Sequence, residues 1–321
     1  MGNAVFVTKL GDASVLEARE HDPGPPGPGQ ARVAVSAVGV NFIDVYFRKG
    51  EYPAEPPFVP GMEGAGVVEA VGEGVDLGIG QRVAWASGLG SYATHVNVAA
   101  ASLVRVPDGV TDEVAAAAML QGMTAHYLVH GCRKPKKGDT ALVHAAAGGT
   151  GLLVVQTLAK AGVRVLGTCS TEEKATLVRE AGAEEVVLYT QDDFVSPTRV
   201  WSGDGVDVVY DSVGRTTFEG SLACLRPRGL LVLFGQSSGP VPPFDPQVLN
   251  TSGSLFLTRP SLLHYVSQPG EFDRRASAVL GSIEQGDLEI RIGARFPLAE
   301  AAKAHRALEG RKTTGKLLLL P

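Results

Sequence analysis

A glycine-rich turn is the part of this sequence whose residue types and spacing allow the most specific chemistry. Residues 146–151 (AAGGTG) follow an apolar run that ends at Ala145, and they approximate the pattern G-x-G-x-x-G with Ala146 in place of the first glycine. Gly148 would let the backbone approach a pyrophosphate, Gly151 would let helix and strand pack closely, and free N–H groups at the helix start would receive the anion. Because the turn lies between a predicted strand and a predicted helix, dinucleotide binding is favoured over an ordinary tight turn.

The end of the next predicted strand bears on which dinucleotide would bind. An NAD site usually places Asp or Glu about 20 residues after the turn, where the carboxylate accepts hydrogen bonds from the adenosine ribose. Residues 167–171 (GTCST) contain no acid, so nothing there would repel a 2′-phosphate. Ser170 could donate through its hydroxyl and Lys174 could supply a positive charge one turn later. The alternative is that Ser170 and Thr171 cap a helix while Lys174 lies on a solvated face. The absent acid has more weight than the lysine, and the sequence therefore allows NADPH.

The seven histidines and three cysteines could form a zinc site, so their spacing is informative. The cysteines are too widely spaced for a closed tetrahedral site. His126 and His130 stand one helical turn apart, but no H-E-x-x-H pattern accompanies them, so packing or surface histidines are the favoured interpretation. A serine in a G-x-S-x-G elbow is also absent. We therefore predict no metal site and no hydrolytic machinery.

Length and composition limit the possible classes of protein. The 321 residues suffice for two domains, and 44% hydrophobic with 20% charged residues is typical of a folded chain. A net charge of -5 disfavours broad nucleic-acid binding. Cys132, Cys169 and Cys224 form no disulfide framework, and no apolar run approaches the length of a membrane span or a signal segment, so we expect a cytoplasmic protein.

Two kinds of periodicity divide the chain. Residues 4–106 contain short apolar or alternating runs separated by Gly and Pro, which predicts an all-β unit. From about residue 111, strands and helices alternate, which predicts an α/β fold with a doubly wound parallel sheet. The expected elements are a helix from residue 111, strands at 141–145, 163–167, 185–189, 206–210 and 229–234, and helices at 152–161 and 171–181. A helix near 271–285 and a strand at 316–320 form a tail that we expect to return to the first domain.

Six motifs in order carry a family resemblance. They are Asn41-Phe42-Ile43-Asp44-Val45-Tyr46, Pro60-Gly61-Met62-Glu63-Gly64-Ala65-Gly66, Gln121-Gly122-Met123-Thr124-Ala125-His126-Tyr127, the Ala-Gly turn, Tyr210-Asp211-Ser212-Val213-Gly214 and Leu257-Thr258-Arg259-Pro260. The chain resembles, over nearly its whole length, the zinc-independent quinone oxidoreductase branch (ζ-crystallin-like) of the medium-chain dehydrogenase/reductase superfamily. In zinc-bearing members of that superfamily a Cys stands in place of Asn41 and a His in place of Met62, and the four-cysteine structural lobe is also missing here.

The resemblance implies a fold and a domain organisation. Residues 1–120 and 261–321 would form a discontinuous GroES-like β-barrel catalytic domain, and residues 121–260 a six-stranded Rossmann NADPH-binding domain. Relatives commonly dimerise by joining Rossmann sheets along an edge, so residues 253–258 are the candidate edge strand of a homodimer.

The resemblance also implies site residues. Asn41 and Thr124 would lie near the nicotinamide, and Tyr46 and Tyr52 would line the substrate pocket; these four are the candidate catalytic residues. The implied cofactor-binding residues are Asn41, Thr124, Gly148, Gly149, Gly151, Ser170, Lys174, Tyr189, Ser212, Phe234, Gly235, Leu257 and Arg259. Structural alternatives are that Phe234 and Leu257 belong to a strand core and that Tyr52 anchors a loop.

The activity implied is NADPH-dependent reduction of quinones by hydride transfer without zinc. A quinone is already a good hydride acceptor, so loss of a Lewis-acid metal is tolerable for that substrate class. A second hypothesis is reduction of the C=C bond of α,β-unsaturated carbonyl compounds. A third, from another class, is a structural crystallin-like or RNA-binding protein, for which the local basic cluster of Arg133, Lys134, Lys136 and Lys137 is a candidate. A solvated turn is the favoured interpretation of that cluster.

Overall fold

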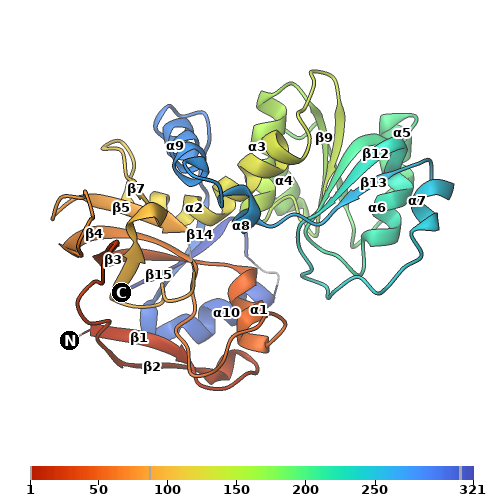
Figure 1. Cartoon of the computed structure of the whole chain (residues 1–321). Helices are drawn as coiled ribbons and strands as arrows, with labels where there is room; N and C mark the ends of the chain where they lie inside the picture. Colours follow the sequence, from red (N-terminus) through yellow and green to blue (C-terminus); the bar gives the residue numbers. More distant parts are fainter. Residues whose placement is uncertain (1, 87, 311–312) are drawn as a thin grey trace. The chain divides into compact units, whose positions relative to one another are not determined.

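The computed structural model describes residues 2–86, 88–310 and 313–321 of the chain (Figure 1). It separates into two compact units: unit 1 comprises Met1–Met123 with Gln268–Pro321, and unit 2 is Thr124–Ser267. Within the described residues, no helix combines the length and the apolar character that crossing a membrane would need.

Unit 1 is built on a seven-stranded sheet and a separate antiparallel pair. The pair is β1 (Gly2–Val7) with β2 (Leu16–His21). The larger sheet contains β3 (Gln30–Val40), β4 (Glu63–Val71), β5 (Arg82–Ala86), β6 (His95–Ala99), β7 (Leu103–Arg105), β14 (Ile292–Pro297) and β15 (Lys316–Leu320). The C-terminal strand β15 pairs antiparallel with β3, with Leu318 opposite Gly39. The tail of the chain thus completes the sheet begun by the N-terminal segment.

Four helices of unit 1 bear on the site. They are α1 (Phe42–Lys49), α2 (Asp112–Tyr127), α9 (Glu271–Glu284) and α10 (Ala301–Glu309). The expectation of an all-β unit over residues 4–106 was therefore incomplete, because α1 lies within it. Local signals explain α1: Asn41 precedes its first turn, the Asp44 carboxylate accepts the Asn41 N–H at 2.8 Å, and Gly50 ends the helix in the left-handed conformation with φ 78°.

Unit 2 is a six-stranded parallel sheet in the order β10-β9-β8-β11-β12-β13. The strands are β8 (Thr140–Val143), β9 (Arg164–Cys169), β10 (Glu185–Leu188), β11 (Val206–Asp211), β12 (Leu225–Leu233) and β13 (Phe256–Thr258). The helices are α3 (Gly149–Lys160), α4 (Glu172–Glu180), α5 (Val195–Ser202), α6 (Phe218–Cys224), α7 (Gln247–Thr251) and α8 (Leu262–Tyr265). The predicted doubly wound fold is confirmed, and its strand order reverses between β8 and β11, the point at which such sheets bind ligands.

Several element boundaries in unit 2 differ from the predicted ones; β12, for example, begins at Leu225 rather than at residue 229, and the two differences below have a backbone cause. Strand β8 ends at Val143, because Ala145 takes the left-handed conformation with φ 50°, and α3 already begins at Gly149. The edge strand is shorter than the expected residues 253–258, since Gly253 has φ 111° and Ser254 φ 55°. Only Phe256–Thr258 pairs with β12.

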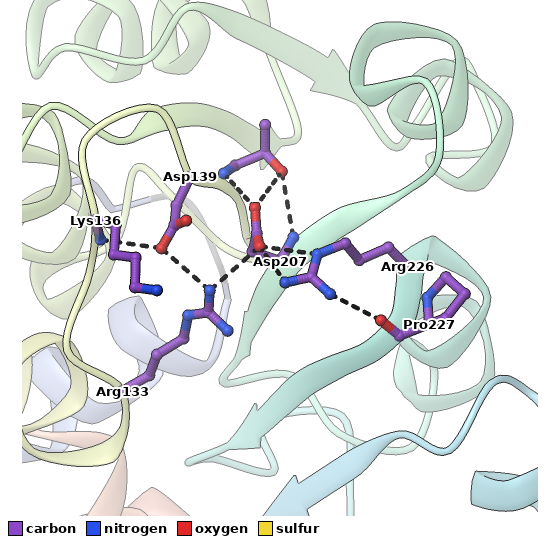
Figure 2. A network of polar contacts seen from close by, with 7 residues as sticks. Arg133, Lys136, Asp139, Asp207, Arg226 and Pro227 are labelled. Carbon is purple, nitrogen blue, oxygen red and sulfur yellow. Dashed lines mark hydrogen bonds and ion pairs between the residues drawn. The ribbon is translucent and has the colours of Figure 1, made fainter.

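A polar cluster ties the amino-terminal ends of the unit 2 strands together (Figure 2). Asp207, in β11, accepts the backbone N–H of Thr140 at 2.9 Å and lies between Arg133 and Arg226, whose guanidinium nitrogens are 3.2 and 2.7 Å from its Oδ1. Arg133 also contacts Asp139 at 3.1 Å. Ion pairs and hydrogen bonds therefore link the starts of β8, β11 and β12, whereas the glycine-rich turn follows the opposite, carboxyl end of β8.

Candidate functional site

The glycine-rich turn of unit 2 has the geometry of an anion-binding helix start. Gly148 caps α3, and a Cβ atom at Gly151 would lie 2.4 Å from the carbonyl oxygen of Ala145, so only glycine fits there. The first N–H groups of a helix have no acceptor within it, and they carry the positive end of the helix dipole. The turn therefore offers a cradle for a pyrophosphate.

A buried hydrogen-bond network centred on His144 lies next to this turn in the chain. The sequence did not predict it. His144 Nδ1 lies 3.0 Å from the Thr168 hydroxyl and Nε2 lies 3.1 Å from the Ser221 hydroxyl, which in turn donates to Asp211 at 2.9 Å. Because Ser221 donates to the carboxylate, its oxygen must accept from Nε2–H, and Nδ1 accepts from Thr168. Burial lowers the pKa of His144, which keeps the ring neutral as this chain of donors requires. The only sequence signal was a histidine at the end of an apolar strand.

The expected adenosine-phosphate residues lie together at the ends of β9 and β10. The Lys174 ammonium donates to the Ser170 hydroxyl at 3.3 Å, and the Tyr189 N–H donates to Cys169 at 3.1 Å. Tyr189 is 42% exposed. The helix cap proposed as an alternative is also present: the Thr171 hydroxyl, not that of Ser170, accepts the Lys174 N–H at the start of α4. Ser170 is thus left able to bind a ligand.

Apart from Thr124, the remaining unit 2 residues follow or belong to the last strands. Ser212 and Phe234 follow β11 and β12, and the Phe234 N–H donates to the Asp211 carbonyl at 2.8 Å. A Cβ at Gly235 would meet the Ser212 backbone at 2.5 Å, so the two segments touch. Leu257 packs against the hydrophobic core of unit 2, as its structural alternative expected. Arg259 directly follows β13, and Thr124 is buried in α2.

In unit 1, Asn41 is 4% exposed and both ends of its amide are engaged. Its Nδ2 donates to Glu63 Oε1 at 2.6 Å, and its Oδ1 accepts from Lys316 Nζ at 2.7 Å and from Gln121 Nε2 at 3.2 Å. Lys316 and Glu63 also form an ion pair with each other. Burial lowers the pKa of the Lys316 ammonium, and the Glu63 charge opposes that effect.

Tyr46 and Tyr52 lie together in unit 1. Their ring centroids are 5.4 Å apart in an edge-to-face arrangement, and the Tyr52 ring also lies 5.7 Å from that of Phe47. The Tyr52 N–H donates to the Tyr46 carbonyl at 3.3 Å, just beyond the end of α1. Both the anchoring role and the pocket-lining role expected for Tyr52 are compatible with this position.

A second buried chain of polar groups starts at Asp44. Its Oδ2 accepts from the Tyr92 hydroxyl at 3.1 Å, Tyr92 lies 3.0 Å from His305 Nε2, and Arg48 lies 2.9 Å from His305 Nδ1. Arg48 also binds Glu309 at 2.9 Å. Since Arg48 can only donate, His305 Nδ1 accepts and Nε2–H donates toward Tyr92. No local sequence pattern predicts this series of hydrogen bonds, because its members come from α1, a loop and α10.

The residues at the zinc-ligand positions do not suit zinc. The Asn41 amide is occupied by Glu63, Lys316 and Gln121, and Met62 is a buried thioether. Zinc in proteins takes thiolate, imidazole or carboxylate ligands. Throughout the described part of the chain, no three His, Cys, Asp or Glu side chains come together as a metal site would require. His126 and His130 pack ring against ring at 4.9 Å.

Two family models match the chain. The model described as "Alcohol dehydrogenase GroES-like domain" matches residues 27–108, and the one described as "Zinc-binding dehydrogenase" matches residues 181–319.

Full-length relatives are similar to this chain. It is 45% identical to "Quinone oxidoreductase" of Pseudomonas aeruginosa and 40% identical to "Quinone oxidoreductase 1" of Escherichia coli, covering 100% of both chains in each case. It is 43% identical to "2-haloacrylate reductase" of a Burkholderia species, over 99% of this chain and 98% of that protein.

Solved structures are similar as well. A mycobacterial protein complexed with NADPH is 48% identical, with a TM-score of 0.97 over 100% of both chains. The Escherichia coli quinone oxidoreductase complexed with NADPH is 39% identical, with a TM-score of 0.97 over 99% of this chain and 100% of that one.

Proposed function

Because the chain belongs to the quinone oxidoreductase family of the medium-chain dehydrogenase/reductase superfamily, we propose that it reduces quinones with NADPH. The observation that carries this function is the full-length similarity to quinone oxidoreductases, including one solved with NADPH. The anion-binding turn at Gly148 and the Ser170–Lys174 pair support the same cofactor.

Unit 2 binds the cofactor in this proposal. NADPH, when bound, supplies a hydride from the nicotinamide ring. The N–H groups at the start of α3 hold the pyrophosphate, and Ser170 and Lys174 bind the adenosine 2′-phosphate, with Tyr189 beside them. The residues proposed for the rest of the cofactor are Thr124, Gly149, Gly151, Ser212, Phe234, Gly235, Leu257 and Arg259.

Unit 1 orients the substrate. Tyr46 and Tyr52 each carry a phenolic O–H that can donate to a quinone oxygen, and their edge-to-face contact restricts both rings. In the proposal Asn41 lies beside the nicotinamide; the contacts of its amide with Glu63 and Lys316 support a fixed orientation of this side chain. Positioning is the main catalytic contribution of these side chains. A proton reaches the reduced oxygen from water or from a tyrosine hydroxyl.

The reaction as proposed needs no zinc. The side chains at Asn41 and Met62 support this, because an engaged amide and a thioether are unsuitable ligands. A quinone gains aromaticity on reduction and so depends less on a Lewis acid than a simple carbonyl does.

The proposed activity is tested by steady-state turnover with NADPH and either 1,4-benzoquinone or 1,4-naphthoquinone, compared with an alkenal series. We expect kcat/KM to be highest for the quinones. Higher kcat/KM for every alkenal than for both quinones would contradict the proposal.

One comparison favours a second candidate function, the reduction of activated C=C bonds. The similar Burkholderia protein is named for 2-haloacrylate, an α,β-unsaturated acid. Hydride addition to such a double bond would use the same cofactor-binding residues. Turnover of 2-chloroacrylate with NADPH, exceeding that of quinones, would establish this function instead.

Assembly and location complete the proposal. The exposed Phe256 on edge strand β13 supports a homodimer formed along that edge. The buried thiols of Cys169 and Cys224 support a reducing, cytoplasmic location. Arg133 is engaged by Asp139 and Asp207, which supports the absence of a nucleic-acid function for the basic cluster at 133–137.

A further inference from the structure

A buried ion pair lies behind Asn41 in unit 1. Lys316, at the start of β15, and Glu63, at the start of β4, have side-chain exposures of 1% and 0% and contact each other. Isolated buried charges are strongly unfavourable, and such a pair persists only where its remaining hydrogen-bonding capacity is used. Here Asn41 takes up that capacity on both sides, because its amide bridges the two charges.

The ion pair permits only one orientation of the Asn41 amide. A carboxylate only accepts hydrogen bonds and an ammonium group only donates them. Nδ2 must therefore face Glu63, and Oδ1 must face Lys316, as the distances of 2.6 and 2.7 Å record. The flipped amide would set oxygen against oxygen and N–H against N–H.

This orientation passes on to Gln121. Asn41 Oδ1 can only accept, so Gln121 must turn its Nε2 toward it, at 3.2 Å, and its Oε1 must point away. Gln121 is partly exposed, unlike Asn41. The Lys316–Glu63 ion pair thus determines, through Asn41, that the Gln121 amide atom turned away from Asn41 is the acceptor Oε1.

The helix that carries Gln121 is itself held in place. Glu63 uses its second oxygen, Oε2, to accept the Leu120 backbone N–H at 2.7 Å. On another face of α2, a Cβ at Gly122 would meet Val279 of α9 at 2.6 Å, so the two helices are in close contact. The same carboxylate therefore positions both the backbone and, through Asn41, the side chain of this segment.

We propose that Gln121 contacts the bound ligands through Oε1, accepting a hydrogen bond from an N–H or O–H donor, and that Glu63 and Lys316 are its positioning residues. This rests on the proposed function, in which Asn41 lies beside the nicotinamide. Two donors have the required chemistry: the carboxamide N–H of NADPH and the hydroxyl of the quinol product.

Two sets of variants test the proposal. Gln121→Met keeps the length of the side chain and removes its hydrogen bonds. The double variant Glu63→Gln/Lys316→Met removes both buried charges together, avoiding the unpaired charge that either single change would leave, and it no longer imposes one amide orientation. The matched control is Glu300→Gln/Lys303→Met, which removes a surface pair of the same chemistry, 2.6 Å apart, from the same unit.

Binding measurements separate the two donors. Fluorescence titration compares NADPH with its 3-acetylpyridine analogue, which lacks the carboxamide N–H, and product inhibition is measured with 1,4-naphthohydroquinone. For a carboxamide contact, we expect the preference of the wild type for NADPH over the analogue to fall roughly three- to tenfold in Gln121→Met, the range of one ordinary hydrogen bond. For a quinol contact, the inhibition constant of the quinol rises by a similar factor while that preference is unchanged. In either case the double variant shows a smaller change in the same direction, and the control shows none.

The proposal is overturned if Gln121→Met keeps both the wild-type preference for NADPH over the analogue and the wild-type inhibition constant of the quinol. A double variant that matches the surface control would overturn the positioning role, and should the double variant not fold, Asn41→Leu replaces it as the break in the relay. The titration needs no turnover, so a wild type that binds NADPH with the expected preference but reduces no quinone supports this inference while contradicting the proposed function. A wild type that does not bind NADPH contradicts both.

Discussion

Lys174 lies one turn into α4, and its ammonium group donates to the Ser170 hydroxyl at 3.3 Å. No acidic side chain follows the end of β9 until the first turn of α4, at Glu172 and Glu173. At the scale of single residues, this pair is where the choice of cofactor is expected to be made, because a 2′-phosphate adds charge that a lysine can match and a ribose hydroxyl does not.

We expect Lys174→Ala to raise the KM for NADPH roughly 10- to 150-fold, since hydrogen bonds to charged groups contribute about 1.5–3 kcal/mol, and to leave the KM for NADH unchanged. Lys134→Ala, at an exposed lysine of the same unit, serves as the control. Steady-state kinetics with both cofactors makes the comparison. An equal rise in KM for NADPH and NADH would show that Lys174 does not bind the 2′-phosphate.

Some site residues could be predicted from the sequence and others could not. The turn at Gly148 and the Ser170–Lys174 pair depend on short-range patterns, so they were accessible. Lys316 could not be predicted as a site residue, because it begins an apolar run and its partners Asn41 and Glu63 lie 275 and 253 residues away. Pairing over such separations depends on the β15–β3 and β3–β4 registers, which no local pattern specifies.

At the scale of elements, the hydrogen-bond chain from Asp44 to Arg48 joins α1 to α10 through Tyr92 and His305. Two of its titratable members, Asp44 and His305, have pKa values shifted in opposite directions. Burial raises the pKa of the Asp44 carboxyl to about 7, and burial together with the Arg48 charge lowers the pKa of His305 to about 3. The stability supplied by Asp44 is thus present at low pH and lost as the pH rises toward 7. That supplied by His305 is present above its ordinary pKa and lost as the pH falls.

Removing either Asp44 or His305 should leave the pH dependence of stability that the other group causes. Relative to wild type, we expect the unfolding free energy of Asp44→Asn to rise with pH by about 1.4 kcal/mol per pH unit between about pH 4.5 and 6.5, and that of His305→Gln to fall at a similar rate. Urea unfolding followed by Trp85 fluorescence, in a Trp201→Phe background, reports on unit 1 because Trp85 is buried there. Differences that do not vary with pH would refute the opposing titrations.

The start of α3 gives a second prediction at this scale. Gly151→Ala would place a methyl group 2.4 Å from the Ala145 oxygen, forcing the turn apart, and overpacking of this kind costs about 1–3 kcal/mol. We expect weaker NADPH binding and a lower Tm. Gly281→Ala, where a Cβ meets open space in α9, should instead stabilise the protein by roughly 0.5–1 kcal/mol and leave NADPH binding unchanged. NADPH binding by Gly151→Ala as tight as that of the wild type would contradict pyrophosphate binding at this turn.

The elements themselves were predictable to different degrees. Buried parallel strands such as β8 and β11 are continuous apolar runs, so their alternation with helices could be read directly. Helix α1 was missed because Phe42, Val45 and Tyr46 are strand-forming residues. The local signs of a helix were Asn41 and Asp44 in its first turn and Gly50 at its end.

At the scale of the whole molecule, the parallel order β10-β9-β8-β11-β12-β13 leaves β13 as an edge strand with Phe256 61% exposed. An unpaired edge with an apolar side chain is a template for pairing with a second copy. We expect a dimer at micromolar concentration and at least about tenfold weaker association for Phe256→Glu, from the apolar burial lost in both copies.

Val200→Glu is the control for dimerisation, because Val200 is 82% exposed on α5, a helix that packs against α6 and β11. Sedimentation velocity compares the oligomeric state of the wild type, Phe256→Glu and Val200→Glu. A monomeric wild type, or equal dissociation in both variants, would exclude the β13 edge as the interface.

The central claim is that this fold orients NADPH and a quinone well enough for hydride transfer without a metal ion. Its most direct test is elemental analysis of the purified protein combined with quinone turnover before and after exhaustive chelation. We expect no stoichiometric zinc and an unchanged kcat. One tightly held zinc ion per chain, whose removal abolishes turnover and whose return restores it, would contradict the account.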